Sequence, residues 1–255
     1  MKRIDYFIKK YLENRPLFHA FIRPQEASLF YENQRYIKSP ILDFGCGDGF
    51  FSQIVFGKGK INIGLDLIKS RANEAEKENI YQKVVYYDEK TIPYPDDYFR
   101  TVISNCVLEH LPNLNYSLKE IHRVLKPGGY FLATVMTDRW EEHLLGSKIF
   151  GKFYKNFMRK IQQHHNLLTM KQWGNKFIKT GFKAIKSIGY FHQNLAQHNE
   201  LFHYLSFPSF LSHKLFGRWV IFPKLNLSWK SYFKKIISSN NPDSFAACFY
   251  LLWKT

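Results

Sequence analysis

The chain has 255 residues, enough for one α/β domain with additions but too few for two full-sized domains. Its apolar content of 45% excludes a disordered protein, and its three cysteines form no C-x-x-C pair, which argues against a disulfide framework or a zinc site. The formal charge of +16 is concentrated in residues 139–255, which hold 18 Lys and Arg but 4 Asp and Glu. This half therefore carries either ordinary solvated charge or a face for an anionic partner, such as a phosphorylated lipid, a membrane surface or a nucleic acid.

The first 138 residues show the periodicity of an alternating α/β chain. Residues 4–22 and 26–36 have apolar positions at helical spacing, and the second helix is expected to end before Ser39-Pro40. Residues 41–44 form a short apolar run that ends in glycines, as buried parallel strands do. This alternation predicts a Rossmann-like, doubly wound and mostly parallel sheet with helices on both faces. The other predicted elements are strands at 61–65, 83–87, 101–105 and 130–136, and helices at 70–79 and 114–125, with a turn at 126–129.

After residue 138 the alternation stops. Residues 139–180 are predicted to be helical, 183–190 to form a strand, and 191–243 to be irregular. Residues 244–253 are expected to form the last strand, antiparallel to the others. We therefore expect a single domain whose parts are N-terminal helices in 1–37, a ligand-binding core in 38–138, and lid insertions in 139–182 and 191–243.

The strongest chemical signal is the glycine-rich segment DFGCGDG, residues 43–49, after the first predicted strand. Alternate glycines let the backbone approach a ligand closely, and the carboxyl ends of parallel strands form the ligand crevice of such a sheet. Asp66 ends the second strand, where a carboxylate can accept hydrogen bonds from both hydroxyls of a ribose, in NAD or in S-adenosylmethionine. The alternatives are a tight turn without a ligand and an N-cap role for Asp66.

Five motifs follow one another in a characteristic order. Residues 41–49 (ILDFGCGDG) place an acid two residues before G-x-G-x-G, whereas dinucleotide-binding dehydrogenases show G-x-G-x-x-G. The others are 63–66 (IGLD), 92–99 (IPYPDDYF), 107–111 (VLEHL) and 125–129 (LKPGG). Together they resemble the class I S-adenosylmethionine-dependent methyltransferases, nearest to the subgroup acting on small molecules, quinones and sugars. The resemblance covers residues 38–137 and, more loosely, 164–190.

The resemblance implies S-adenosylmethionine as cofactor. The glycine turn would face its methionine part, Asp66 would hold the ribose, Asp88 with Glu89 would contact the adenine edge, and Asn105 would border the methionine end. The sulfonium already activates the methyl group, so the reaction needs in-line alignment and exclusion of water. We expect no metal, because no metal-like ligand spacing is visible. The expected cofactor-binding residues are Asp43, Gly45, Cys46, Gly47, Asp66, Leu67, Asp88, Glu89 and Asn105.

Two histidines are candidates for a general base, which a hydroxyl acceptor would require. His110 follows the fourth predicted strand, near the reacting methyl group, although it could instead be a structural histidine at a helix start. His165, in the pair His164-His165, is the second candidate, and its alternative is a surface position on a basic helix.

The acceptor is expected to be a small molecule, a sugar or a lipid-linked compound. Residues 104–107 (SNCV) lack the proline that adenine N6 methyltransferases carry there, and the Pro-Cys pair of cytosine C5 methyltransferases does not occur. RNA is therefore the weaker alternative as acceptor. A non-catalytic nucleoside-binding protein is a further alternative. Residues 202–224 mix aromatic and basic side chains, which suits a membrane interface or a lid packed on the sheet. Without an apolar signal segment or a long apolar run, we expect a cytoplasmic protein that contacts a membrane only peripherally.

Overall fold

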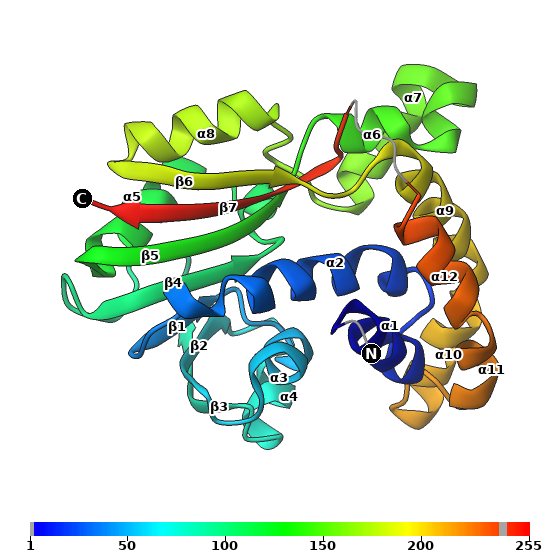
Figure 1. Cartoon of the computed structure of the whole chain (residues 1–255), viewed down its shortest axis with the longest axis horizontal. Coiled ribbons are helices and arrows are strands. Elements are labelled where there is room, and N and C mark those ends of the chain that lie inside the picture. The colour runs from blue at the N-terminus through cyan, green and yellow to red at the C-terminus, as the bar shows by residue number, and fades with distance from the viewer. Residues whose placement is uncertain (1–2, 240–243) are drawn as a thin grey trace.

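A computed structural model describes residues 3–239 and 244–255, and its sheet has seven strands in the order β3-β2-β1-β4-β5-β7-β6 (Figure 1). Neighbouring strands from β3 to β5 pair in parallel, whereas β7 lies antiparallel between β5 and β6. The predicted Rossmann-like, doubly wound sheet with an antiparallel last strand is confirmed. The strands are β1 (Ile41–Phe44), β2 (Ile61–Leu67), β3 (Tyr81–Tyr87), β4 (Phe99–Asn105), β5 (Leu125–Met136), β6 (Phe182–Gly189) and β7 (Ala247–Lys254).

Both faces of this sheet are buried, each under its own helices. Because successive strand residues point to opposite faces, Ile103 and Leu132 belong to one apolar core and Val102 and Phe131 to the other. The second core is covered by α5 (Leu114–Val124) and α8 (Met170–Lys179). The first is covered by α1 (Arg3–Asn14), α2 (His19–Glu32), α3 (Phe50–Phe56) and α4 (Ala72–Lys77).

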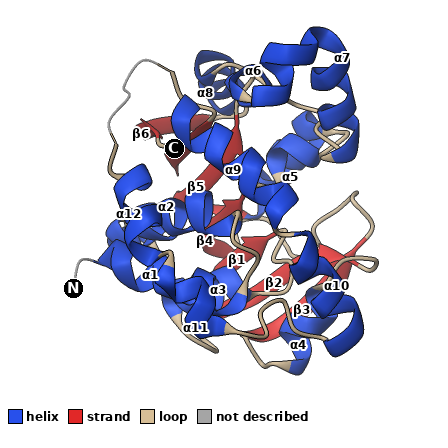
Figure 2. Ribbon diagram, turned by 90° about the vertical axis from the view of Figure 1, so that its right-hand side faces the viewer, coloured by secondary structure: helices blue, strands red, loops and turns tan. Residues whose placement is uncertain are grey.

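A further group of helices gathers at one end of the sheet, on the right in Figure 1 and toward the viewer in Figure 2. Residues 191–243 were predicted to be irregular, and this prediction is wrong for the described part, which is largely helical. In α9 and α10 apolar side chains lie on more than one face: Phe202 is buried, whereas Leu201 and Leu205 are exposed. A clear 3.6-residue period is therefore missing in these two helices. The helices are α6 (Arg139–His143), α7 (Leu145–Ile161), α9 (Gln193–Leu205), α10 (Phe207–Phe216), α11 (Pro223–Ser228) and α12 (Lys230–Ile237).

Two bounds in the first half need correction. Residues 4–22 and 26–36, predicted as two helices, divide at another place: α1 ends at Asn14, and α2 runs from His19 to Glu32 with Pro24 inside it. Pro16 lies in the break between them, where its missing N–H leaves no helical hydrogen bond unmade. Residues 126–129, predicted as a turn, fall within the bounds of β5, but the register with β4 passes from Leu125 directly to Tyr130 and Gly128 has φ of 74°, so they form a bulge in the strand. Within the described ranges, no helix combines the length and apolarity needed to cross a bilayer.

Candidate active site

The turn after β1 contains three glycines in the left-handed region. Gly45, Gly47 and Gly49 have φ angles of 78°, 52° and 73°, which side-chain-bearing residues rarely adopt. A Cβ on Gly45 would lie 2.4 Å from Val107 Cγ2, so packing alone excludes a side chain there. A Cβ on Gly47 would meet no atom within 4 Å. The space beside Gly47 is therefore open for a ligand.

Asp66, near the end of β2, is tied directly to this turn. Its Oδ2 accepts a hydrogen bond from the backbone N–H of Gly47, and its Oδ1 accepts one from Leu67, both at 2.7 Å. The residue at the N-cap of α4 is Arg71, so Asp66 has no capping role there. A carboxylate has more lone pairs than these two bonds use, and Asp66 is only half-buried. It can therefore still accept from a ligand.

Asp43, in β1, is buried beneath the turn. Its Oδ2 accepts hydrogen bonds from the hydroxyls of Ser52 and Tyr81. Burial raises the pKa of Asp43 to about 6, although these two hydrogen bonds act in the opposite direction. Asp43 thus joins β1, α3 and β3 at the base of the turn.

A cavity of about 190 Å³, here called the glycine cavity, lies beside the turn. Five of the predicted cofactor residues line it, namely Asp43, Gly45, Cys46, Gly47 and Asn105. The remaining four do not line it and lie at the adjacent ends of β2 and β3: Asp66, Leu67, Asp88 and Glu89. Asp88 and Glu89 are exposed. The structure thus gathers the residues predicted for the methionine end around one cavity.

Helix α2 contributes site residues that no motif indicated. His19, Arg23 and Glu26 are spaced so that they share one face of the helix. Glu26 is fully buried and accepts hydrogen bonds from Arg23 Nη1 at 2.8 Å, Asn105 Nδ2 at 3.0 Å and the hydroxyl of Tyr190 at 3.0 Å. This network fixes the amide of Asn105 in the wall of the glycine cavity.

Three more residues of the glycine cavity come from segments without a recognisable motif. Arg15 forms an ion pair with Asp48 at 2.7 Å, and Arg71 approaches the same carboxylate at 3.0 Å. The guanidinium of Arg71 lies 5.3 Å from the ring centre of Trp219. Trp219 belongs to the segment predicted as a lid, and it lines the glycine cavity.

A second cavity of about 300 Å³, here called the histidine cavity, adjoins the first. His19 and Arg23 line both cavities. Much of the remaining wall comes from the 3₁₀ turn η2 (Leu108–His110), from α6 and α7, and from α9 and α10. The segments on either side of β6 therefore surround this cavity.

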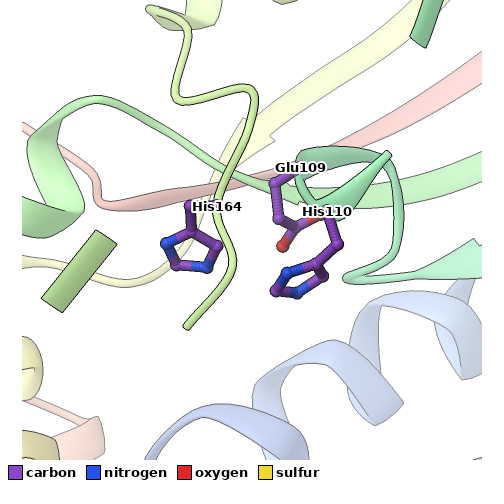
Figure 3. A group of neighbouring side chains, drawn as sticks. All are labelled: Glu109, His110 and His164. Atoms are coloured by element: carbon purple, nitrogen blue, oxygen red, sulfur yellow. The ribbon is translucent and has the colours of Figure 1, made fainter. Parts of the chain in front are cut away.

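Glu109, His110 and His164 lie side by side in the wall of the histidine cavity (Figure 3). The two imidazole rings have their centres 4.9 Å apart. Burial raises the pKa of Glu109 to about 7. Burial, with smaller effects of His110 and Arg159, lowers the pKa of His164 to about 3, so that this imidazole is neutral at neutral pH.

The two predicted general bases occupy different environments. His110 lines the histidine cavity, and burial lowers its pKa. His165 is exposed and lines neither cavity, while its backbone N–H donates to the carbonyl of Glu109 at 2.8 Å. That bond holds the segment so that His164, and not His165, reaches the cavity.

Comparison with known proteins agrees with this arrangement. Residues 42–133 match the family described as a methyltransferase domain. A malonyl-[acyl-carrier protein] O-methyltransferase of Pseudescherichia vulneris is 25% identical over 193 residues, which cover 71% of this chain and 77% of that protein. The enzyme of the same name from Hamiltonella defensa is 33% identical over 99 residues, but these cover only 39% of this chain and 38% of the relative. A solved structure of a SAM-dependent methyltransferase from Archaeoglobus fulgidus superposes with a TM-score of 0.55 at 17% identity, over 91% of this chain and 94% of that one.

The strand order, the glycine turn and the family match define a class I, S-adenosylmethionine-dependent methyltransferase domain. The predicted resemblance is confirmed, and S-adenosylmethionine is the cofactor of this domain.

Proposed function

We propose that the chain transfers the methyl group of S-adenosylmethionine, held in the glycine cavity, to an oxygen of an acceptor held in the histidine cavity. The observation that carries this proposal is the common wall formed by His19 and Arg23. In addition, Asn105 lines one cavity and the next residue, Cys106, lines the other. An in-line displacement needs donor and acceptor on opposite sides of the methyl group, and adjoining chambers suit that geometry.

The histidine cavity suits a small acceptor that carries a carboxylate. Arg23 lines it, and an arginine fork matches the two oxygens of a carboxylate. Such a group, with an ordinary pKa of about 4, is ionised at neutral pH and needs no general base. The names of two relatives describe O-methylation of a malonyl group on a carrier protein, which agrees with this chemistry. A role of His110 as base is proposed only for a hydroxyl acceptor, and none is proposed for His165, which is exposed and lines neither cavity.

We further propose that the acceptor is linked to a lipid or a carrier, and that the face around the histidine cavity lies on an anionic membrane surface. Tyr204 and Phe210 line this cavity and are 56% and 39% exposed, so they mark its mouth. Near them α7, α9 and α10 expose further apolar side chains, among them Phe153, Phe207 and Phe216. Exposed aromatic groups among Lys and Arg favour insertion at a charged interface. This would make the protein cytoplasmic and peripheral to the membrane.

Methyl-labelled S-adenosylmethionine tests the acceptor class. The purified chain is incubated separately with a carrier-linked malonyl group, a lipid extract and RNA, and the label is traced in each. We expect it in the carrier-linked or the lipid fraction. Label in RNA alone would replace this proposal, and label in none of them, with cofactor binding intact, would favour a non-catalytic nucleoside-binding role.

Sedimentation with vesicles tests the membrane contact. The chain should sediment with vesicles of anionic lipid, less so at 1 M salt, where the Debye length is about 3 Å, and only weakly with neutral vesicles. Three exposed cations in and after α10, the helix that carries Phe210, should abolish most of this binding when they are changed to Glu: Lys214, Arg218 and Lys224. A control with the same charge change at the opposite, amino ends of the strands should keep it: Lys38, Lys60 and Lys83. Equal losses of vesicle binding in both variants would show that the net charge of the chain, and not this face, causes the binding.

A further inference from the structure

Three side chains of metal-ligating type converge in the wall of the histidine cavity. Glu109 and His110 end the turn after β4, and His164 follows α7, so only folding brings them together. One ligand atom from each lies within 4.8 Å of the others. Tetrahedral ligands about 2.1 Å from one ion lie about 3.4 Å apart, so a pair separated by the full 4.8 Å must close by about 1.4 Å. Small changes in side-chain torsion angles can supply such a movement.

Unpartnered polar atoms are a second, independent indication of a ligand. Among the described residues, Glu109 Oε2 and His164 Nδ1 are buried without a hydrogen-bond partner. The other oxygen of Glu109 accepts the backbone N–H of Met136 at 3.2 Å, so Oε2 is left for something else. Buried polar groups without a partner are costly, and one cation would satisfy both.

The orientation of His110 also fits a ligand. Its Nδ1 lies 3.4 Å from the carbonyl oxygen of Gln163. A contact of this kind places the proton on Nδ1 and leaves the lone pair on Nε2, as backbone carbonyls do for metal-bound histidines.

We propose that Glu109, His110 and His164 bind one divalent first-row transition-metal ion, whose remaining coordination positions face the histidine cavity. Two imidazoles and one carboxylate suit such ions, and three protein ligands leave positions open. An acceptor carboxylate could occupy an open position and be held in place there. That use of the ion depends on the proposed function, whereas binding of the ion does not. The expectation of no metal relied on spacing along the chain, which cannot reveal ligands joined by the fold.

Cobalt binding tests the site on the full chain after treatment with a chelator. We expect one Co²⁺ per chain, seen as visible d–d absorption and displaced by Zn²⁺. Glu109→Gln and His164→Ala should each weaken Co²⁺ binding by about tenfold or more. His165→Ala removes the same side chain from the next position, outside the cluster, and should bind Co²⁺ like the wild type.

Titration of each variant with S-adenosylmethionine shows that it is folded and separates this inference from the proposed function. Normal cofactor binding without stoichiometric Co²⁺ binding would overturn the metal site and leave methyl transfer unaffected. An equal loss of Co²⁺ binding in His165→Ala would also overturn it. Bound Co²⁺ in a chain that methylates none of the tested acceptors would support the metal site and contradict the proposed function.

Discussion

Gly47→Ala should separate ligand binding from stability. The residue has φ of 52°, and a Cβ there meets no protein atom within 4 Å, so the variant has backbone strain but no clash in the free protein. The left-handed conformation should cost about 1–2 kcal/mol of unfolding free energy. In the complex the added methyl group projects into the glycine cavity. An overpacking cost of about 1–3 kcal/mol corresponds to a roughly 5- to 150-fold larger dissociation constant for S-adenosylmethionine.

Gly59→Ala is the matched control for this experiment. Gly59 lies between α3 and β2 with φ of 69°, a Cβ there also meets nothing within 4 Å, and the residue does not line the glycine cavity. Both variants should lose similar stability in urea unfolding, but only Gly47→Ala should lose affinity in isothermal titration. Equal affinities of the two variants, whether both normal or both reduced, would refute the assignment of the open space beside Gly47 to the cofactor.

Three further predictions concern the same region. We propose that Asp66 accepts hydrogen bonds from both ribose hydroxyls of the cofactor. Asp66→Ala should then weaken binding of S-adenosylmethionine by about 1–3 kcal/mol, because these hydroxyls and the N–H of Gly47 lose their acceptor; unchanged affinity in titration would remove Asp66 from the site. Asp43 has a pKa raised from 3.8 to about 6, so the native state holds this proton more tightly and stability falls as pH rises from about 4 to 6. The unfolding free energy of Asp43→Asn, measured in urea, should therefore rise relative to that of the wild type by on the order of 3 kcal/mol across that pH range. If the two proteins lose stability in parallel as the pH rises, Asp43 is not the cause. Trp219→Ala should weaken cofactor binding by about 1 kcal/mol or less through loss of its contact with Arg71, whereas Trp229→Ala, an exposed tryptophan that does not line the cavity, should not.

The central strands and the glycine turn could be predicted because their signals are local. Residues 41–44 form a strand with the predicted bounds, since an apolar run followed by glycines has few other conformations in a parallel sheet. The turn at 126–129 was predicted from its glycines, but its place inside a strand depends on distant contacts. Leu125 and Tyr130 pair with β4 on either side of it, and such pairing is not encoded in nearby residues.

The rest of the site depends on contacts between distant segments. His19 and Arg23 line the cavities, and Glu26 supports them from beneath, because α2 packs beside the carboxyl end of β4, where Glu26 bonds Asn105. Their helical spacing was the one available signal, and it was weak, because α2 carries other polar residues such as Gln25, Ser28 and Glu32 and has no clear apolar face. The sequence could not distinguish His164 from His165, since that choice depends on the backbone bonds of the segment to Glu109.

The most direct measurement of the central claim is isothermal titration of the purified chain with S-adenosylmethionine, its demethylated product and NAD. The account predicts that the first two bind at one molecule per chain, that Gly47→Ala weakens both, and that NAD does not bind. Binding of NAD in place of S-adenosylmethionine, or binding of S-adenosylmethionine that Gly47→Ala leaves unchanged, would contradict a cofactor site at the glycine turn.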